Sequence, residues 1–215
     1  MGREDWYRLE TWSEADQEAF FARLSRSRGL YNKSQYARIQ AGYLQNVGLV
    51  DEALQLLQRL YDEWPDKSQL ATAYWQEANC YLLKKKLDAA IDAYRKCFRA
   101  EEDSDFRSTT NARVEFLWLV ATKGLRDLYE EALQEIDKLQ HPSIFPVDQY
   151  RTAGALALIK SDSGLKENIA SLAQAALEAA SRTESGLRYH KGLALVRNPD
   201  RKIIERLKEL AAEPA

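Results

Sequence analysis

The sequence predicts an all-α fold: an α-solenoid of antiparallel helix pairs with capping helices at both ends. Glycine (9) and proline (5) are scarce among the 215 residues, and strong helix formers dominate the composition. Apolar residues recur with helical spacing in segments of about 15 residues, and short turn signals separate these segments. No stretch alternates with period two for long enough to predict a β-strand. These observations together favour paired helices along the whole chain.

Composition and charge narrow the classes of partner. The 31 basic and 33 acidic residues nearly cancel, so we expect neither a nucleic acid nor a membrane surface as partner. No apolar run reaches the ~18 residues of a membrane span, and the start "MGREDWYRLETW" lacks a signal-peptide core. Two cysteines cannot staple a chain of this size, which indicates a reducing, cytoplasmic setting.

The first element is a helix over residues 13–28. Ser13 precedes acidic residues in the first turn, and basic residues lie in the last turn, as expected for a capped helix. Gly29 is predicted to end it.

Three aromatic residues, Trp6, Tyr7 and Trp12, precede this helix in a polar context. We expect them to fold back over the first helix, so that residues 1–33 form an N-terminal aromatic segment with a capping helix. The alternative is an exposed aromatic patch that binds a partner or a second copy of the chain as a homodimer.

Residues 34–181 are predicted to form about four helix pairs. Glycine, proline or charged turn residues separate the two members of each pair. In order, the paired segments are 34–48 with 51–65, 68–85 with 87–102, 109–124 with 126–142, and 146–164 with 165–181.

The tail, residues 182–215, is predicted to hold weakly basic C-terminal capping helices. It contains a short segment, "GLRYHKGLALV", and a last helix opened by Asn198 and Pro199, with Pro199 at the first helical position. Residues 182–209 include four acidic residues and eight basic ones. The basic residues are Arg182, Arg188, Lys191, Arg197, Arg201, Lys202, Arg206 and Lys208.

The helix pairs share a pattern of small and large residues. Counted from Ser34, positions 8, 11, 15, 20, 24, 27 and 32 hold Ala41, Leu44, Gly48, Ala53, Leu57, Leu60 and Pro65. Counted from Ala71, positions 8, 11, 20, 24 and 27 hold Ala78, Tyr81, Ala90, Tyr94 and Cys97. Two further units keep part of the pattern: Tyr129, Ala132, Ile136 and Leu139, and then Ala157, Gly164, Ala173 and Ala176.

This pattern resembles the tetratricopeptide repeat (TPR), a helix pair of about 34 residues, over roughly residues 34–180. The whole chain is also similar to uncharacterised bacterial TPR proteins that have a Trp-rich start and an "SGLRYH"-like segment. The resemblance implies stacked pairs with a concave inner surface, and a bacterial, cytoplasmic protein.

TPR arrays usually bind ligands against the first helix of each pair. Position 5 of the successive repeats holds Arg38, Trp75, Trp118 and Gly154. With neighbouring positions, the resemblance implies the partner-binding residues Arg38, Gln45, Trp75, Asn79, Trp118 and Arg151. Tryptophan and arginine supply much of the binding energy at interfaces. The alternative is that the two indoles pack against neighbouring helices. Gly42 stands where the family's carboxylate clamp needs Asn, so a chaperone-tail receptor is not expected.

No motif in the sequence predicts catalysis. Cys80 and Cys97 fall at packing positions of facing helices, and Lys84, Lys85 and Lys86 fit a helix end and turn. His190 lies among Arg188, Tyr189 and Lys191 without a placed acid or nucleophile, which favours a terminal helix with a basic face. There is no nucleophile elbow, phosphate loop or zinc spacing, so we expect no enzyme, metal or cofactor.

The sequence therefore predicts a non-enzymatic TPR module, an adaptor or scaffold that binds a protein or peptide in its concave groove. The alternative is a regulator or immunity-type inhibitor that occludes one specific effector protein.

Overall fold

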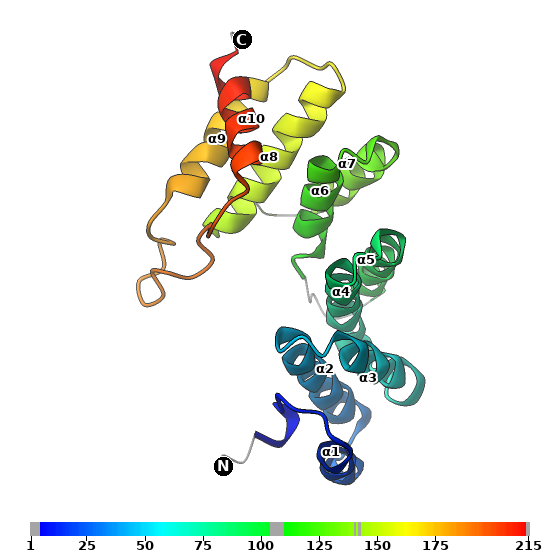
Figure 1. Ribbon diagram of the computed structural model, residues 1–215. Coiled ribbons are helices and arrows are strands. Elements are labelled where there is room, and N and C mark those ends of the chain that lie inside the picture. The colour runs from blue at the N-terminus through cyan, green and yellow to red at the C-terminus, as the bar shows by residue number, and fades with distance from the viewer. Residues whose placement is uncertain (1–4, 104–109, 140, 142, 214–215) are drawn as a thin grey trace. The chain divides into compact units, whose positions relative to one another are not determined.

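The computed structural model describes residues 5–103, 110–139, 141 and 143–213. Within them the chain forms ten α-helices and two short 3-10 turns, and no β-strand occurs among these residues (Figure 1). The predicted all-α class is confirmed, and neighbouring helix pairs pack as in a helical repeat fold. The chain divides into two compact units, residues 1–112 and 113–215.

Unit 1 (residues 1–112) contains a 3-10 turn and two helix pairs behind the N-terminal helix. Its elements are η1 (Asp5–Tyr7), α1 (Glu14–Arg26), α2 (Leu30–Asn46), α3 (Val50–Glu63), α4 (Lys67–Leu83) and α5 (Leu87–Glu102). Helix α2 packs on α3 and α4 packs on α5, while α4 also contacts α2 and α3. The first two pairs thus form where the sequence predicts them, although α2 begins four residues before Ser34.

Small residues allow the close helix approach in unit 1. Ala41 and Ala53 are fully buried and face a core of leucines that includes Leu44, Leu57 and Leu60. Helices approach closely where one presents alanine and the other fills the gap with a larger side chain.

The N-terminal aromatic residues fold back over unit 1, as predicted. Tyr7 is buried, and its ring lies 4.6 Å from that of Tyr36 on α2, centroid to centroid. Trp6 and Trp12 are partly buried against the same core. The side-chain amide of Gln40 holds the segment because it accepts from the Leu9 N–H and donates to the Leu9 carbonyl, both at 2.8 Å.

Unit 2 (residues 113–215) contains a short pair followed by a three-helix cluster. Its elements are α6 (Ala112–Lys123), η2 (Arg126–Leu128), α7 (Tyr129–Asp137), α8 (Pro146–Asp162), α9 (Ile169–Ser181) and α10 (Arg201–Ala212). Helix α10 packs on both α8 and α9 and buries Leu207 and Leu210. The last helix therefore caps the pair before it.

The structure of the tail, residues 182–213, contradicts two of the predictions made from the sequence. Residues 182–200 form turns and bends, so the stretch around His190 is not a terminal helix and α10 alone follows α9. Ser185 closes this segment because its N–H donates to the Lys191 carbonyl at 2.7 Å. Pro199 does not occupy the first helical position of α10, since Asp200 caps the helix by accepting from the Lys202 N–H at 2.8 Å.

Candidate functional site

The predicted partner-binding residues of unit 1 lie on α2 and α4. Arg38, Gln45, Trp75 and Asn79 are all partly buried. The Arg38 guanidinium Nε donates to Oε1 of Gln69 at 2.8 Å, and burial lowers the pKa of Arg38. Arg38 therefore joins the first helices of two successive pairs while part of its side chain stays accessible. A partner-binding role for these four residues stays a prediction.

In unit 2, Trp118 on α6 and Arg151 on α8 come together. The Trp118 ring lies 4.9 Å from the Tyr150 ring, centroid to centroid, and covers Gly154, where an added Cβ would lie 3.1 Å from the indole. Arg151 Nη1 donates to Oε1 of Glu115 at 3.3 Å. Both side chains thus connect α6 with α8, and both also line a hollow.

We name this space the inner hollow. It has a volume of about 370 Å³, and its walls come from α6, α8 and the segment that leads into α10. Its principal lining residues are Trp118, Lys123, Tyr150, Arg151, Arg197 and Asp200.

Tyr150 is the unusual residue of the inner hollow. Tyr150 is 3% exposed, and its hydroxyl has no hydrogen-bond partner within the part of the chain that the structure describes. Burial, together with the negative charge of Asp200, raises the pKa of Tyr150 to about 12. The phenol is therefore protonated at neutral pH and has a hydrogen to donate.

A second space in unit 2, which we name the apolar trough, is lined by a different set of residues. It has a volume of about 550 Å³. Its floor consists of Val114, Ile136, Leu139, Ala153, Leu156 and Leu172. Sequence reasoning missed this site.

The short helix α7 explains the trough. Helix α7 has nine residues, whereas α8 has 17. At 1.5 Å per residue these helices span about 13 and 25 Å, so α7 cannot cover the full length of α8. The trough opens where α7 ends, between its last turn, α8 and α9. The only sequence signal was the brevity of the apolar pattern between Tyr129 and Leu139.

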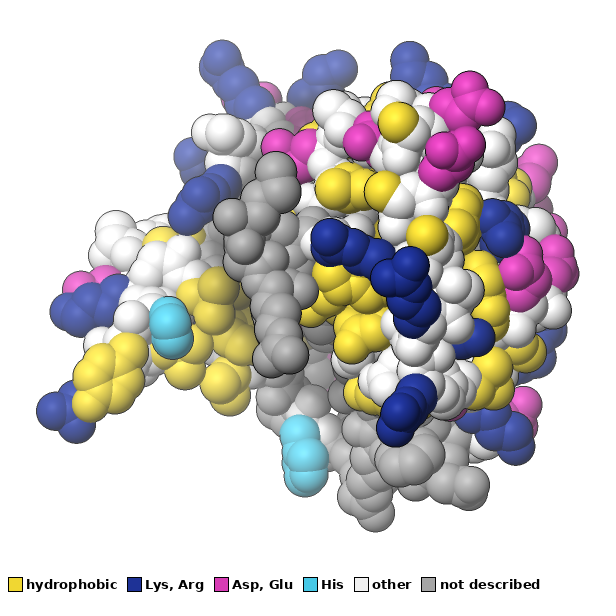
Figure 2. All heavy atoms as spheres, turned by 90° about the horizontal axis from the view of Figure 1, so that it is seen from below, with side chains coloured by type: hydrophobic (Ala, Val, Ile, Leu, Met, Phe, Trp, Pro, Cys, Tyr) yellow, Lys and Arg dark blue, Asp and Glu magenta, His cyan; other side chains and the backbone are white. Residues whose placement is uncertain are grey.

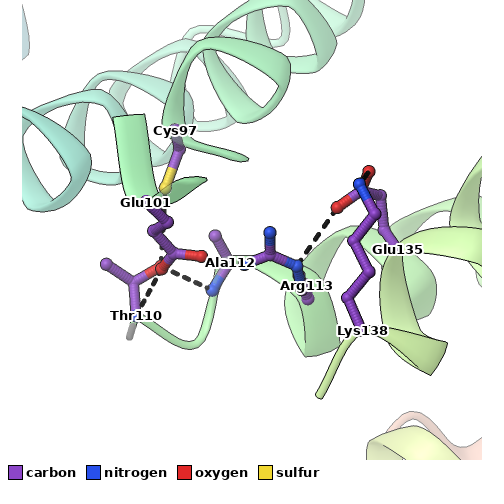
Figure 3. A network of polar contacts seen from close by, with 7 residues as sticks. All are labelled: Cys97, Glu101, Thr110, Ala112, Arg113, Glu135 and Lys138. Atoms are coloured by element: carbon purple, nitrogen blue, oxygen red, sulfur yellow. Dashed lines mark hydrogen bonds and ion pairs between the residues drawn. The ribbon is translucent and has the colours of Figure 1, made fainter. Parts of the chain in front are cut away.

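An ion-pair network joins α6 to α7 beside the trough residues Val114 and Ile136 (Figure 3). Arg113 Nε donates to Oε2 of Glu135 at 3.1 Å, which joins α6 to α7. Lys138 Nζ donates to Oε1 of the same carboxylate at 2.6 Å. The Arg113 and Glu135 side chains are 7% and 13% exposed, so this ion pair is largely shielded from solvent.

The cysteines occupy packing positions in unit 1, as predicted. Both are buried, and the two do not form a disulfide with each other. Burial, with a smaller effect of the Glu77 charge, raises the pKa of Cys80 to about 12. Cys97 Sγ lies 3.4 Å from the Thr110 hydroxyl, and that hydroxyl donates to Glu101 at 2.8 Å (Figure 3). These contacts pack the Cys97 thiol against Thr110, just before α6 begins.

Glu77 is the principal buried acid of unit 1. It is 6% exposed on α4 and accepts from the Tyr61 hydroxyl at 3.1 Å. Lys96 Nζ lies 3.8 Å from its other oxygen. Burial and the neighbouring Glu77 carboxylate raise the pKa of Tyr61 well above its usual range. This network ties α3, α4 and α5 together.

Among the described residues no group of three His, Cys, Asp or Glu could hold a metal ion. The two histidines lie apart on the face seen in Figure 2, where basic, acidic and apolar side chains are interspersed. No helix in the described part of the chain is long and apolar enough to cross a membrane.

Comparisons with protein families, curated proteins and solved structures find no match to this chain. The functional proposal therefore rests on the geometry of the two units.

Proposed function

We propose that this protein is a non-enzymatic binding module of the TPR type, which holds a peptide or a short segment of a protein partner. The observation that carries the proposal is the apolar trough of unit 2. A volume of about 550 Å³ lies within the range of ligand-binding clefts and accommodates several side chains.

The lining of the trough suits a peptide. Leucine and alanine side chains from α8 and α9 form the floor, and Leu156 and Leu172 remain partly exposed there. Asp137, Glu178 and Arg182 stand at its edges. An apolar floor inside a polar rim is typical of protein interfaces, because the floor gains from excluding water while the rim can bind backbone groups.

A peptide-display selection on the immobilised full chain tests this function. Affinities of the selected peptides are then measured by fluorescence anisotropy for the wild type and for Leu156→Glu. We expect Leu156→Glu to weaken binding tenfold or more, because loss of one buried leucine contact is worth about 1.5–3 kcal/mol and 1.4 kcal/mol is tenfold.

Two further variants control for folding. Leu165→Glu places the same charge at an exposed leucine outside the trough, and it should bind as the wild type does. Ala175→Trp fills the trough from an exposed position on α9, so it should block binding without touching the core. A selection that yields no peptide would contradict the proposed function. Peptides that bind wild type and both trough variants equally would contradict the trough as its site.

A further inference from the structure

The inner hollow has an excess of positive charge. Lys123, Arg151 and Arg197 line it, and the one acidic side chain among its lining residues is Asp200. Asp200 is engaged as the cap of α10. Arg151 shares one N–H with Glu115 but carries a planar set of five donors, so it can bind a second acceptor. This lining favours an anion.

The Tyr150 hydroxyl supplies an independent observation. Tyr150 lines the inner hollow, and its buried hydroxyl has no hydrogen-bond partner in the described structure. Buried polar groups are nearly always hydrogen-bonded, and an unmatched group in a native structure needs an explanation. A ligand oxygen within the hollow would accept this hydrogen bond.

The available donors select the kind of anion. Phosphate sites commonly use several backbone N–H groups at a helix start. At the start of α8 those groups are already used, since Val147 N donates to the Ala194 carbonyl at 2.9 Å and Asp148 and Gln149 donate to Phe145. One hydroxyl and the planar fork of Arg151 match the two oxygens of a carboxylate.

We propose that the inner hollow binds a carboxylate, with the Tyr150 hydroxyl and the Arg151 guanidinium as donors and the Trp118 ring as the apolar wall. The carboxylate belongs either to a peptide, as its C-terminus or an acidic side chain, or to a free small acid. The site does not depend on the apolar trough, because the two spaces share no lining residue.

Titration of the full chain by two-dimensional NMR at constant ionic strength tests this site. The probes are the blocked tripeptide acetyl-Ala-Ala-Phe as its acid and as its amide, acetyl-Glu-Ala-Phe amide, and benzoate. We expect at least one carboxylate to shift the Trp118 indole signal and to bind at least tenfold more tightly than the amide that lacks a carboxylate. The probe that binds most tightly identifies the source of the carboxylate.

Tyr150→Phe is the decisive variant, because it removes one oxygen and keeps the ring that packs on Trp118. It should weaken carboxylate binding at least fivefold while the melting temperature stays constant or rises, since an unmatched buried hydroxyl is lost. A merely structural hydroxyl would leave the affinity unchanged, and that result would overturn the proposal. Equal binding of acid and amide, or of no probe at all, would overturn it as well.

Two controls separate this site from general effects. Lys208→Ala removes one positive charge from α10 outside the hollow and should leave the carboxylate affinity unchanged. Leu156→Glu in the trough should also leave it unchanged, so the carboxylate site and the peptide trough can fail separately. A carboxylate affinity that falls equally in Tyr150→Phe and Lys208→Ala would show non-specific attraction and would contradict the site.

Discussion

Glu135 joins α7 to α6 next to the trough residue Ile136. Its carboxylate accepts from Arg113 and Lys138. The Arg113 side chain is 7% exposed, and a buried charge that loses its partner is strongly destabilising.

We expect Glu135→Ala to lower the free energy of unfolding by about 1.5–3 kcal/mol, because Arg113 would lose a charge-assisted hydrogen bond in a nearly water-free setting. Urea denaturation of the full chain, followed by circular dichroism, measures this loss. Lys138→Ala is the matched control, since Lys138 is 46% exposed and such surface pairs are worth about 0–1 kcal/mol. If the two substitutions lowered the free energy of unfolding equally, the claim that the buried Arg113–Glu135 pair matters more than the exposed Lys138–Glu135 pair would be contradicted.

At the scale of elements, each helix pair of unit 1 depends on small residues at its contact. Ala53 and Ala90 are fully buried, on α3 and α5. Ala53→Trp or Ala90→Trp should lower the free energy of unfolding by about 1–3 kcal/mol or more, because an indole cannot fit between packed helices without displacing them.

Thermal melts followed by circular dichroism check this prediction. Gln55→Trp adds the same ring at an exposed position of α3 and should melt as the wild type does. Wild-type melting of Ala53→Trp would mean that the register of small and large residues does not set the helix contact.

The helices could be predicted from the sequence because their signals are local. Ser13 and Asp16 form a reciprocal capping box at the start of α1, and the order of the helix pairs follows from periodicity. The start of α10 could not be predicted from Pro199 alone. Asp200 caps the helix instead, and Asn198 has a left-handed φ of 48°, which lies outside the helical range.

The candidate sites were less predictable because they depend on distances between helices. The sequence pattern placed Trp118 and Arg151 on neighbouring first helices, and both line the inner hollow. It gave no sign that the segment around Arg197 forms another wall. The trough depends on where α7 stops relative to α8, which no single-residue pattern reports.

For the whole molecule, buried phenols and a buried thiol are expected to make the free energy of unfolding vary with pH in the alkaline range. The pKa values of Cys80, Tyr129 and Tyr150 are raised to about 12, in each case first by burial. In the unfolded chain these groups lose their protons near pH 9 for Cys and pH 10 for Tyr, the usual pKa values. The unfolded state therefore binds fewer protons across this range.

We expect the free energy of unfolding to fall as the pH rises from about 9 to about 12. Urea denaturation at a series of alkaline pH values measures the slope. Cys80→Ala and Tyr150→Phe should each make the decline shallower, because each removes one group whose raised pKa links folding to protons. A slope that is the same in all three proteins would contradict the assignment.

The two hydrogen bonds between Gln40 and Leu9 bear on how the first helices are covered. An array of stacked helix pairs exposes an apolar face at its first helix, and a second copy could in principle add there and start a filament. Here the amide of Gln40 imitates a backbone peptide group and binds both polar atoms of Leu9, which keeps Trp6 and Tyr7 over that face. A second copy could add to this face only after both hydrogen bonds between Gln40 and Leu9 had broken.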